Sequence, residues 1–173
     1  MPELRPIRAE AIPKALMKAE RFRLLGESRE AESICRDVLL VEPKNQGATA
    51  TLLLAITDQF SELGGARPAA AMDLLEQITD PYERAYLEGV ICVRWAKSQL
   101  LAGGPGLITY EWLTRAMNAF DRAALLSPPG NDDATLRWNT CVRLLQANPE
   151  IRAIPEEFLS SAPEPIDDED VPI

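Results

Sequence analysis

The sequence predicts an all-α fold, and three observations support that prediction. Apolar residues recur three and four positions apart along most of the chain, which is the periodicity of amphipathic helices. The chain is 46% hydrophobic but only 6% aromatic and is rich in alanine and leucine, which favour helix over sheet. No segment alternates apolar and polar residues in the manner of a strand. At 173 residues, with 14 prolines, the chain predicts one domain of short helices.

The first two helices are predicted on either side of a glycine turn. One spans residues 11–25 and presents a regular apolar face. Gly26 interrupts the pattern, and Ser28 is expected to cap the second helix. Pro43 ends the second helix, because a proline disfavours helical backbone in the residue before it. The apolar face of the first helix consists of Leu16, Ala19, Phe22 and Leu25.

The next three helices are bounded by glycine and proline. A third helix is predicted over residues 46–63, where a glycine pair ends it. A fourth spans residues 68–78 and begins with a proline, which is favoured in the first turn. A fifth spans residues 81–102 and stops at the sequence GGPG, residues 103–106.

Two further helices complete the predicted domain of residues 1–148. They span residues 108–126 and 132–147, with Asn131 as the candidate cap of the second. Residues 149–173 are proline-rich and acidic, and we expect them to be a disordered tail.

The charge is unevenly distributed. The net charge is −9, and residues 149–173 hold eight acidic residues and one basic residue, so the rest of the chain carries only −2. No basic run occurs, so we expect no nucleic-acid partner.

The N-terminus lacks the apolar core of a signal peptide, and no apolar run could span a bilayer. We therefore expect a cytoplasmic protein that does not insert into membranes.

Catalytic and metal-binding motifs are missing from the sequence. There is no histidine, so histidine-dependent triads and metal–histidine sites are excluded, and no phosphate-binding loop occurs. Cys35, Cys92 and Cys141 lie at long spacings among apolar neighbours, without a CxxC pair. We expect them to be small buried hydrophobic residues in a reducing compartment. The expectation is a non-enzyme without a cofactor or metal ion.

One spacing recurs along the chain. In EAESICRDVLLVEPKN, residues 30–45, the successive separations between an alanine, two further residues and a closing proline are 4, 3 and 5 positions. The same separations recur 85 residues later, and a weaker copy with a shifted proline lies between them. The three sets are Ala31, Cys35, Val38 and Pro43; Ala71, Leu75, Ile78 and Pro81; and Ala116, Phe120, Ala123 and Pro128.

The residues upstream of the first set extend the pattern. Ala19, Phe22 and Gly26 precede Ala31 by 12, 9 and 5 positions. Together these positions resemble the tetratricopeptide repeat (TPR), a helix–turn–helix unit of about 34 residues. The resemblance departs at Cys35, where the family usually has an aromatic residue. In the third unit, Gly89 stands where a small residue is expected.

The resemblance implies about three divergent repeats over residues 11–147. The fold would be a short right-handed solenoid of antiparallel helix pairs. The helix over residues 132–147 would be a C-terminal capping helix, because Trp138 stands where a fourth repeat would have a small residue. The alternative is an antiparallel bundle whose spacing arose by chance.

The resemblance also implies where a partner would bind. In TPR proteins the first helix of each pair lines a concave groove, and an amphipathic helix or an extended peptide lies in it. The helical register predicts a mostly apolar groove with arginines at one end. Its predicted lining is Met17, Glu20, Leu24, Ala50, Leu54, Thr57, Tyr86, Val90, Arg94, Asn139 and Arg143.

The acidic tail has two interpretations. It could dock on Arg94 and Arg143, within the chain or in a neighbouring copy, so that a homo-oligomer forms. Its acidic residues are interspersed with Ile166, Val171 and Ile173, which would serve as apolar anchors. Otherwise it is a solubilising extension.

Three functions fit these observations. The first is a non-catalytic interaction module, an adaptor or scaffold, that binds a protein partner. The second is a chaperone of secreted proteins, since some bacterial three-repeat chaperones are similar in size and acidity. The third is the regulatory subunit of an enzyme complex. Arginine outnumbers lysine 14 to 4, which indicates a GC-rich, bacterial genome.

Overall fold

The computed structural model describes residues 3–62, 65 and 67–151 of the chain. Within these ranges the chain is helical and forms no strand, which confirms the predicted all-α class. The tail that we expect to be disordered lies outside the described residues from residue 152 onward. The elements are a short 3-10 helix, Ala9–Ala11, followed by α1 Ile12–Leu24, α2 Ser28–Val41, α3 Gln46–Asp58, α4 Pro68–Leu75, α5 Pro81–Leu101, α6 Gly106–Leu126 and α7 Asp133–Ala147.

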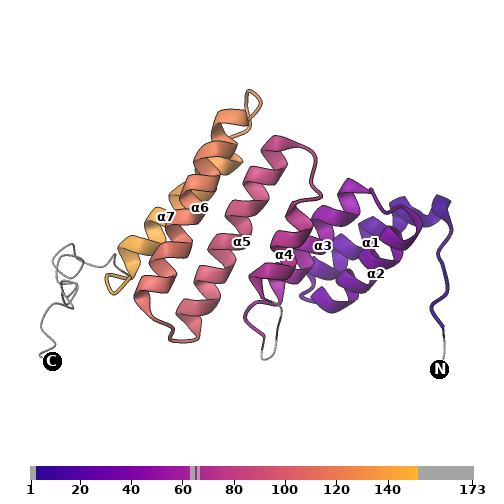
Figure 1. The fold of residues 1–173 in the computed structure, drawn as a ribbon, viewed down its shortest axis with the longest axis horizontal. Coiled ribbons are helices and arrows are strands. Elements are labelled where there is room, and N and C mark those ends of the chain that lie inside the picture. The colour runs from indigo at the N-terminus through magenta and orange to yellow at the C-terminus, as the bar shows by residue number, and fades with distance from the viewer. Residues whose placement is uncertain (1–2, 63–64, 66, 152–173) are drawn as a thin grey trace, which may run out of the picture.

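The helices form a row in chain order. Each helix packs against the next, and α1 and α2 lie at one end of the row while α6 and α7 lie at the other (Figure 1). Alternate helices also meet, because α3 contacts both α1 and α5. These three helices form what we call the α1/α3/α5 layer.

The central helix of the core is α5. Its residues Leu87 and Ile91 belong to a cluster with α1 to α4, whereas Val90 and Val93 belong to a second cluster with α6 and α7. Helix α5 is therefore buried from two directions, and it couples the two halves of the row.

The recurring spacing marks the buried face of the second helix in each pair. All nine residues that precede the prolines in the three sets are at most 8% exposed, and all but Ile78, just beyond α4, lie in helices. Alanine at these positions lets two helix axes approach closely, and the larger residue one turn later fills the space beside it. These residues are Ala31, Cys35, Val38, Ala71, Leu75, Ile78, Ala116, Phe120 and Ala123.

The contact between α5 and α6 shows this complementarity most clearly. Gly89 of α5 faces the ring of Phe120 of α6, and a methyl group built on Gly89 would lie only 2.4 Å from a ring carbon. Phe120 is fully buried, so its ring has no free space to move into. Only glycine fits at this crossing.

Two helix ends differ from the prediction by three residues or more. Helix α3 ends at Asp58 rather than at residue 63, because Phe60 turns into the core, where its ring lies 5.4 Å from that of Trp95. Helix α4 ends at Leu75, and Ile78 beyond it is fully buried in a turn. In both places the buried apolar residue lies in the turn that follows the helix and not in the helix itself.

Neither predicted cap residue occupies the N-cap position. Ser28 is the first residue of α2 and is buried, and Glu27 occupies the cap position. The N-cap of α7 is Asp132 rather than Asn131, although the side-chain oxygen of Asn131 accepts a hydrogen bond from the backbone N–H of Asp133 at 3.0 Å. Gly26 adopts a φ of 79°, a left-handed conformation that suits glycine at the turn between α1 and α2.

The three cysteines are free thiols and fully buried, as predicted. Burial raises the pKa of Cys35 and Cys141 to about 11 and that of Cys92 to about 12. The reactive species is the thiolate, so burial and the raised pKa together suppress their reactivity at neutral pH.

We expect Gly89→Ala to destabilise the protein by about 1–3 kcal/mol, because the added methyl group overlaps the locked ring of Phe120. Helix propensity alone would favour alanine by up to about 1 kcal/mol. The matched control is Gly47→Ala on α3, where the new methyl group would have ordinary contacts at 3.5 Å or more. Urea unfolding should show the first variant less stable than the wild type and the control at least as stable. Equal stability of the two variants would contradict this packing.

We expect the cysteines of the native protein not to react with a thiol reagent such as DTNB at pH 8, and all three to react after denaturation. The thiolate fraction at this pH is very small because burial raises each pKa to about 11 or above. Absorbance at 412 nm measures the reaction. Rapid labelling of a folded chain would show that at least one thiol is accessible.

Candidate functional site

The predicted groove residues have different environments in the structure. On α1, Met17, Glu20 and Leu24 are all exposed. On α3, Leu54 is half-buried, whereas Ala50 and Thr57 are buried. These two side chains therefore belong to the core.

The same division occurs on the later helices. Tyr86 and Arg94 of α5 are half-buried, and Val90 between them is buried. On α7, Asn139 is half-buried and Arg143 is exposed. The structure brings three of the predicted residues into direct contact, namely Leu54, Thr57 and Arg94.

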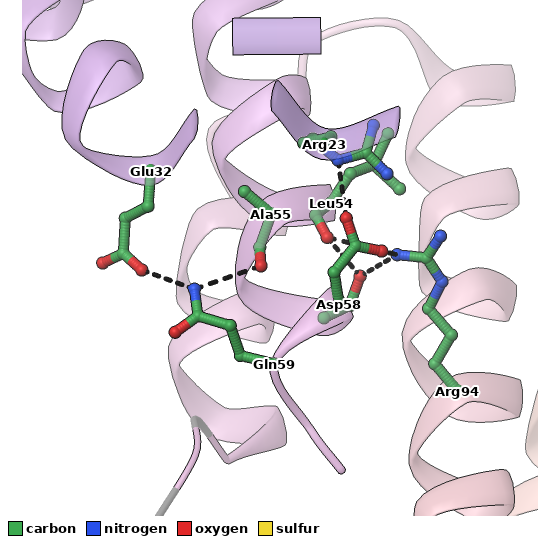
Figure 2. A network of polar contacts seen from close by, with 8 residues as sticks. Arg23, Glu32, Leu54, Ala55, Asp58, Gln59 and Arg94 are labelled. Carbon is green, nitrogen blue, oxygen red and sulfur yellow. Dashed lines mark hydrogen bonds and ion pairs between the residues drawn. The ribbon is translucent and has the colours of Figure 1, made fainter. Parts of the chain in front are cut away.

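A polar cluster joins the three helices of the α1/α3/α5 layer. Asp58, the last residue of α3, accepts a hydrogen bond from Nε of Arg23 of α1 at 2.8 Å and pairs with Arg94 of α5 at 2.5 Å. Figure 2 shows the two arginines meeting the carboxylate from different helices. Their side chains are 17% to 28% exposed, so these ion pairs are partly shielded from water.

Arg94 is held by more than the carboxylate. Its Nη1 donates to the carbonyl oxygen of Leu54 at 3.1 Å and to the hydroxyl of Thr57, which itself donates to Leu54. Burial lowers the pKa of Arg94, and Asp58 opposes that effect. The guanidinium remains charged near neutral pH, because arginine titrates far above that range.

A second set of contacts lies beside this cluster and ties α2 to α3. The amide nitrogen of Gln59 donates to the Glu32 carboxylate at 2.7 Å and to the carbonyl of Ala55 at 3.2 Å (Figure 2). Burial alone would raise the pKa of Glu32, but the hydrogen bonds from Gln59 and Arg36 and the charges of Arg36 and Arg29 together outweigh it, so the pKa is lowered. Glu32 is therefore an ionised structural acceptor near neutral pH.

Positive charge predominates around Arg94. The charges that act on its pKa are one acid, Asp58, and two bases, Arg23 and Arg137 of α7. Arg137 is exposed and its Nε lies 3.3 Å from the Tyr86 hydroxyl, to which it donates. We call Arg23, Arg94, Arg137 and Asp58 the cationic centre; it carries three positive charges and one negative charge.

A different surface lies on the outer side of α1, although Phe22 at its edge also packs against the core. A cavity of about 510 Å³ is lined, among the described residues, by three basic and three apolar side chains. The lining residues are Lys14, Met17, Lys18, Arg21, Phe22 and Leu25, which follow helical spacing along one side. We call this surface the α1 outer face.

The sequence did not identify Arg23, Asp58 and Arg137, although one signal for Asp58 was present. Asp58 is the only charged residue of α3, and it lies at the helix C-terminus, where the helix dipole disfavours a negative charge. A lone acid in such a position requires cationic partners. The identity of those partners depends on how α1 and α5 pack against α3, which the sequence does not specify.

Two further features of the described ranges concern metal binding and membranes. No group of three or more cysteine, aspartate or glutamate side chains gathers there in a way that could hold a metal ion. No helix among the described residues is both long and apolar enough to cross a bilayer.

The fold and this geometry define the chain as an all-helical protein with a cationic centre. Comparisons with protein-family models, with curated proteins and with solved structures found no match to it.

We expect Asp58→Asn to destabilise the protein by about 1–3 kcal/mol, because two partly buried arginines lose their shared counter-charge. Glu62→Gln is the matched control, since Glu62 pairs with Arg29 at the exposed surface, where such pairs contribute less than about 1 kcal/mol. Thermal and urea unfolding of both variants would measure the difference. Equal losses of stability in the two variants would mean that the ion pairs of Asp58 contribute no more than an exposed surface pair.

Proposed function

We propose that this protein is a non-catalytic interaction module, similar to a short TPR solenoid, that binds an acidic peptide or amphipathic helix of a partner protein. The observation that carries the proposal is the cationic centre. Arg23, Asp58 and Arg94 lie on the first helices of the helix pairs and Arg137 lies on α7, within a chain whose net charge is −9.

The arrangement of the helices supports a repeat array. Helices α1 and α2, α3 and α4, and α5 and α6 pack as neighbours, and the first members of these pairs also contact one another. In a solenoid, such contacts between first helices bring their exposed edges onto one side, where an extended partner reaches several repeats at once.

The chemistry of the layer supports an acidic partner with apolar anchors. Arg23 and Arg94 share one carboxylate, so a positive charge remains, and Arg137 beside them is exposed. Leu54 and Tyr86 present half-buried apolar surface near these charges. Guanidinium groups bind carboxylates with two parallel hydrogen bonds, which would fix the register of the bound segment.

The test is selection of binding peptides on the full chain from a display library, followed by affinity measurement on the enriched sequences. We expect enriched peptides that combine aspartate or glutamate with apolar residues at helical spacing. Arg137→Glu should weaken their binding at least about tenfold, because it reverses the exposed charge of the centre.

Lys44→Glu is the matched control, since Lys44 is exposed on the loop between α2 and α3 and carries the same charge. It should leave affinity within about twofold of the wild type. Enrichment of basic or uncharged peptides, or an equal loss of affinity in both variants, would contradict the proposed function.

A further inference from the structure

We propose that the α1 outer face is a docking site for the acidic C-terminal segment, residues 164–173, of a second copy of this chain. The contact would join the α1 end of one copy to the tail of the next. It uses a surface different from the cationic centre and does not depend on the function proposed above.

The α1 outer face combines exposed apolar side chains with cations. Met17 is 70% exposed and Leu25 is 63% exposed, and Leu24 beside them is 88% exposed. Lys14, Lys18 and Arg21 lie between these residues, and none of the three cations has an ion pair among the described residues. Apolar groups this exposed at the end of a helical row form a surface that association would cover.

The charge of the N-terminal region matches that of the tail. Residues 1–25 hold six basic and three acidic residues, a net charge of +3, whereas residues 149–173 carry −7. No acid occurs among the described residues that line the α1 outer face. Attraction between the two ends of the molecule would therefore be strong at low ionic strength.

The sequence of the segment fits a surface of this composition. EPIDDEDVPI holds five acidic residues, of which four in a row lie between Ile166 on one side and Val171 and Ile173 on the other. Isoleucine and valine would cover Met17 and Leu25, and the central carboxylates would pair with the lysines and Arg21. Each of its two prolines has a fixed φ angle, which lowers the conformational entropy lost on binding.

The position of the chain ends favours a second copy as the occupant. The described chain ends at Ile151, beside α6 and α7, whereas α1 lies at the opposite end of the row (Figure 1). Because these two ends lie apart, binding of the tail to a second copy would join the C-terminal end of one molecule to the α1 end of the next. The contact is heterologous, so repeated in one direction it would build head-to-tail chains or rings.

The experiment measures mass against concentration by sedimentation velocity on the full chain. We expect the average mass to rise with concentration at about 0.05 M salt, and the association constant to fall at least about tenfold at 0.5 M. A chain that stays monomeric throughout would overturn the proposal, including the case in which the tail docks within its own molecule.

Two variants localise the contact. Lys14→Glu/Lys18→Glu/Arg21→Glu reverses the α1 outer face, and Asp167→Asn/Asp168→Asn/Glu169→Gln/Asp170→Asn neutralises the tail. Each alone should remain monomeric. An equimolar mixture should form a 1:1 dimer, because the intact tail of the first variant meets the intact α1 outer face of the second. Circular dichroism confirms that each is folded, and absence of the mixed dimer would overturn the proposal.

The matched control is Lys44→Glu/Arg67→Glu/Arg143→Glu, which changes the net charge by the same amount at exposed positions outside α1. It should assemble like the wild type, so loss of assembly in this control would also overturn the proposal. Arg137→Glu, the variant that tests the cationic centre, should assemble normally, so failure of one proposal is distinguishable from failure of the other.

Discussion

The close approach of α5 and α6 is the constraint on which the rest of the structure depends. Phe120 lies directly over Gly89, and any side chain at that position would separate the helices. This contact leaves the opposite side of α5 to pack against α3, and Arg94 then reaches Asp58 and the Leu54 carbonyl. The geometry of the polar cluster is therefore set by apolar packing one helix away.

The electrostatics of the α1/α3/α5 layer follow from one carboxylate serving two arginines. Partial burial strengthens each ion pair, and it also makes the cluster intolerant of losing Asp58. Because Asp58 neutralises only one of the two arginines, the layer retains a positive charge, to which Arg137 adds. A localised positive charge on an acidic protein attracts acidic partners.

The cationic centre and the α1 outer face share a preference for acidic segments but differ in construction. The first is rigid, hydrogen-bonded and flanked by half-buried residues, whereas the second is a single helix side with open apolar side chains. A partner at the centre would gain specificity from fixed guanidinium geometry. A tail at the α1 outer face would gain affinity from apolar burial and long-range attraction, so ionic strength would control it more strongly.

By itself, the sequence determined the helical class, most helix ends and the buried positions of the recurring spacing, because periodicity, glycine and proline act locally. The tertiary structure alone decided which helix sides face water. Helix α3 is apolar on almost every side, so its register could not show that Ala50 and Thr57 are buried while Leu54 is partly exposed. The tertiary structure also determined which residues pair with Asp58, because Arg23 lies 35 residues before Asp58 and Arg94 lies 36 residues after it. Contacts at such separations depend on how whole helices pack.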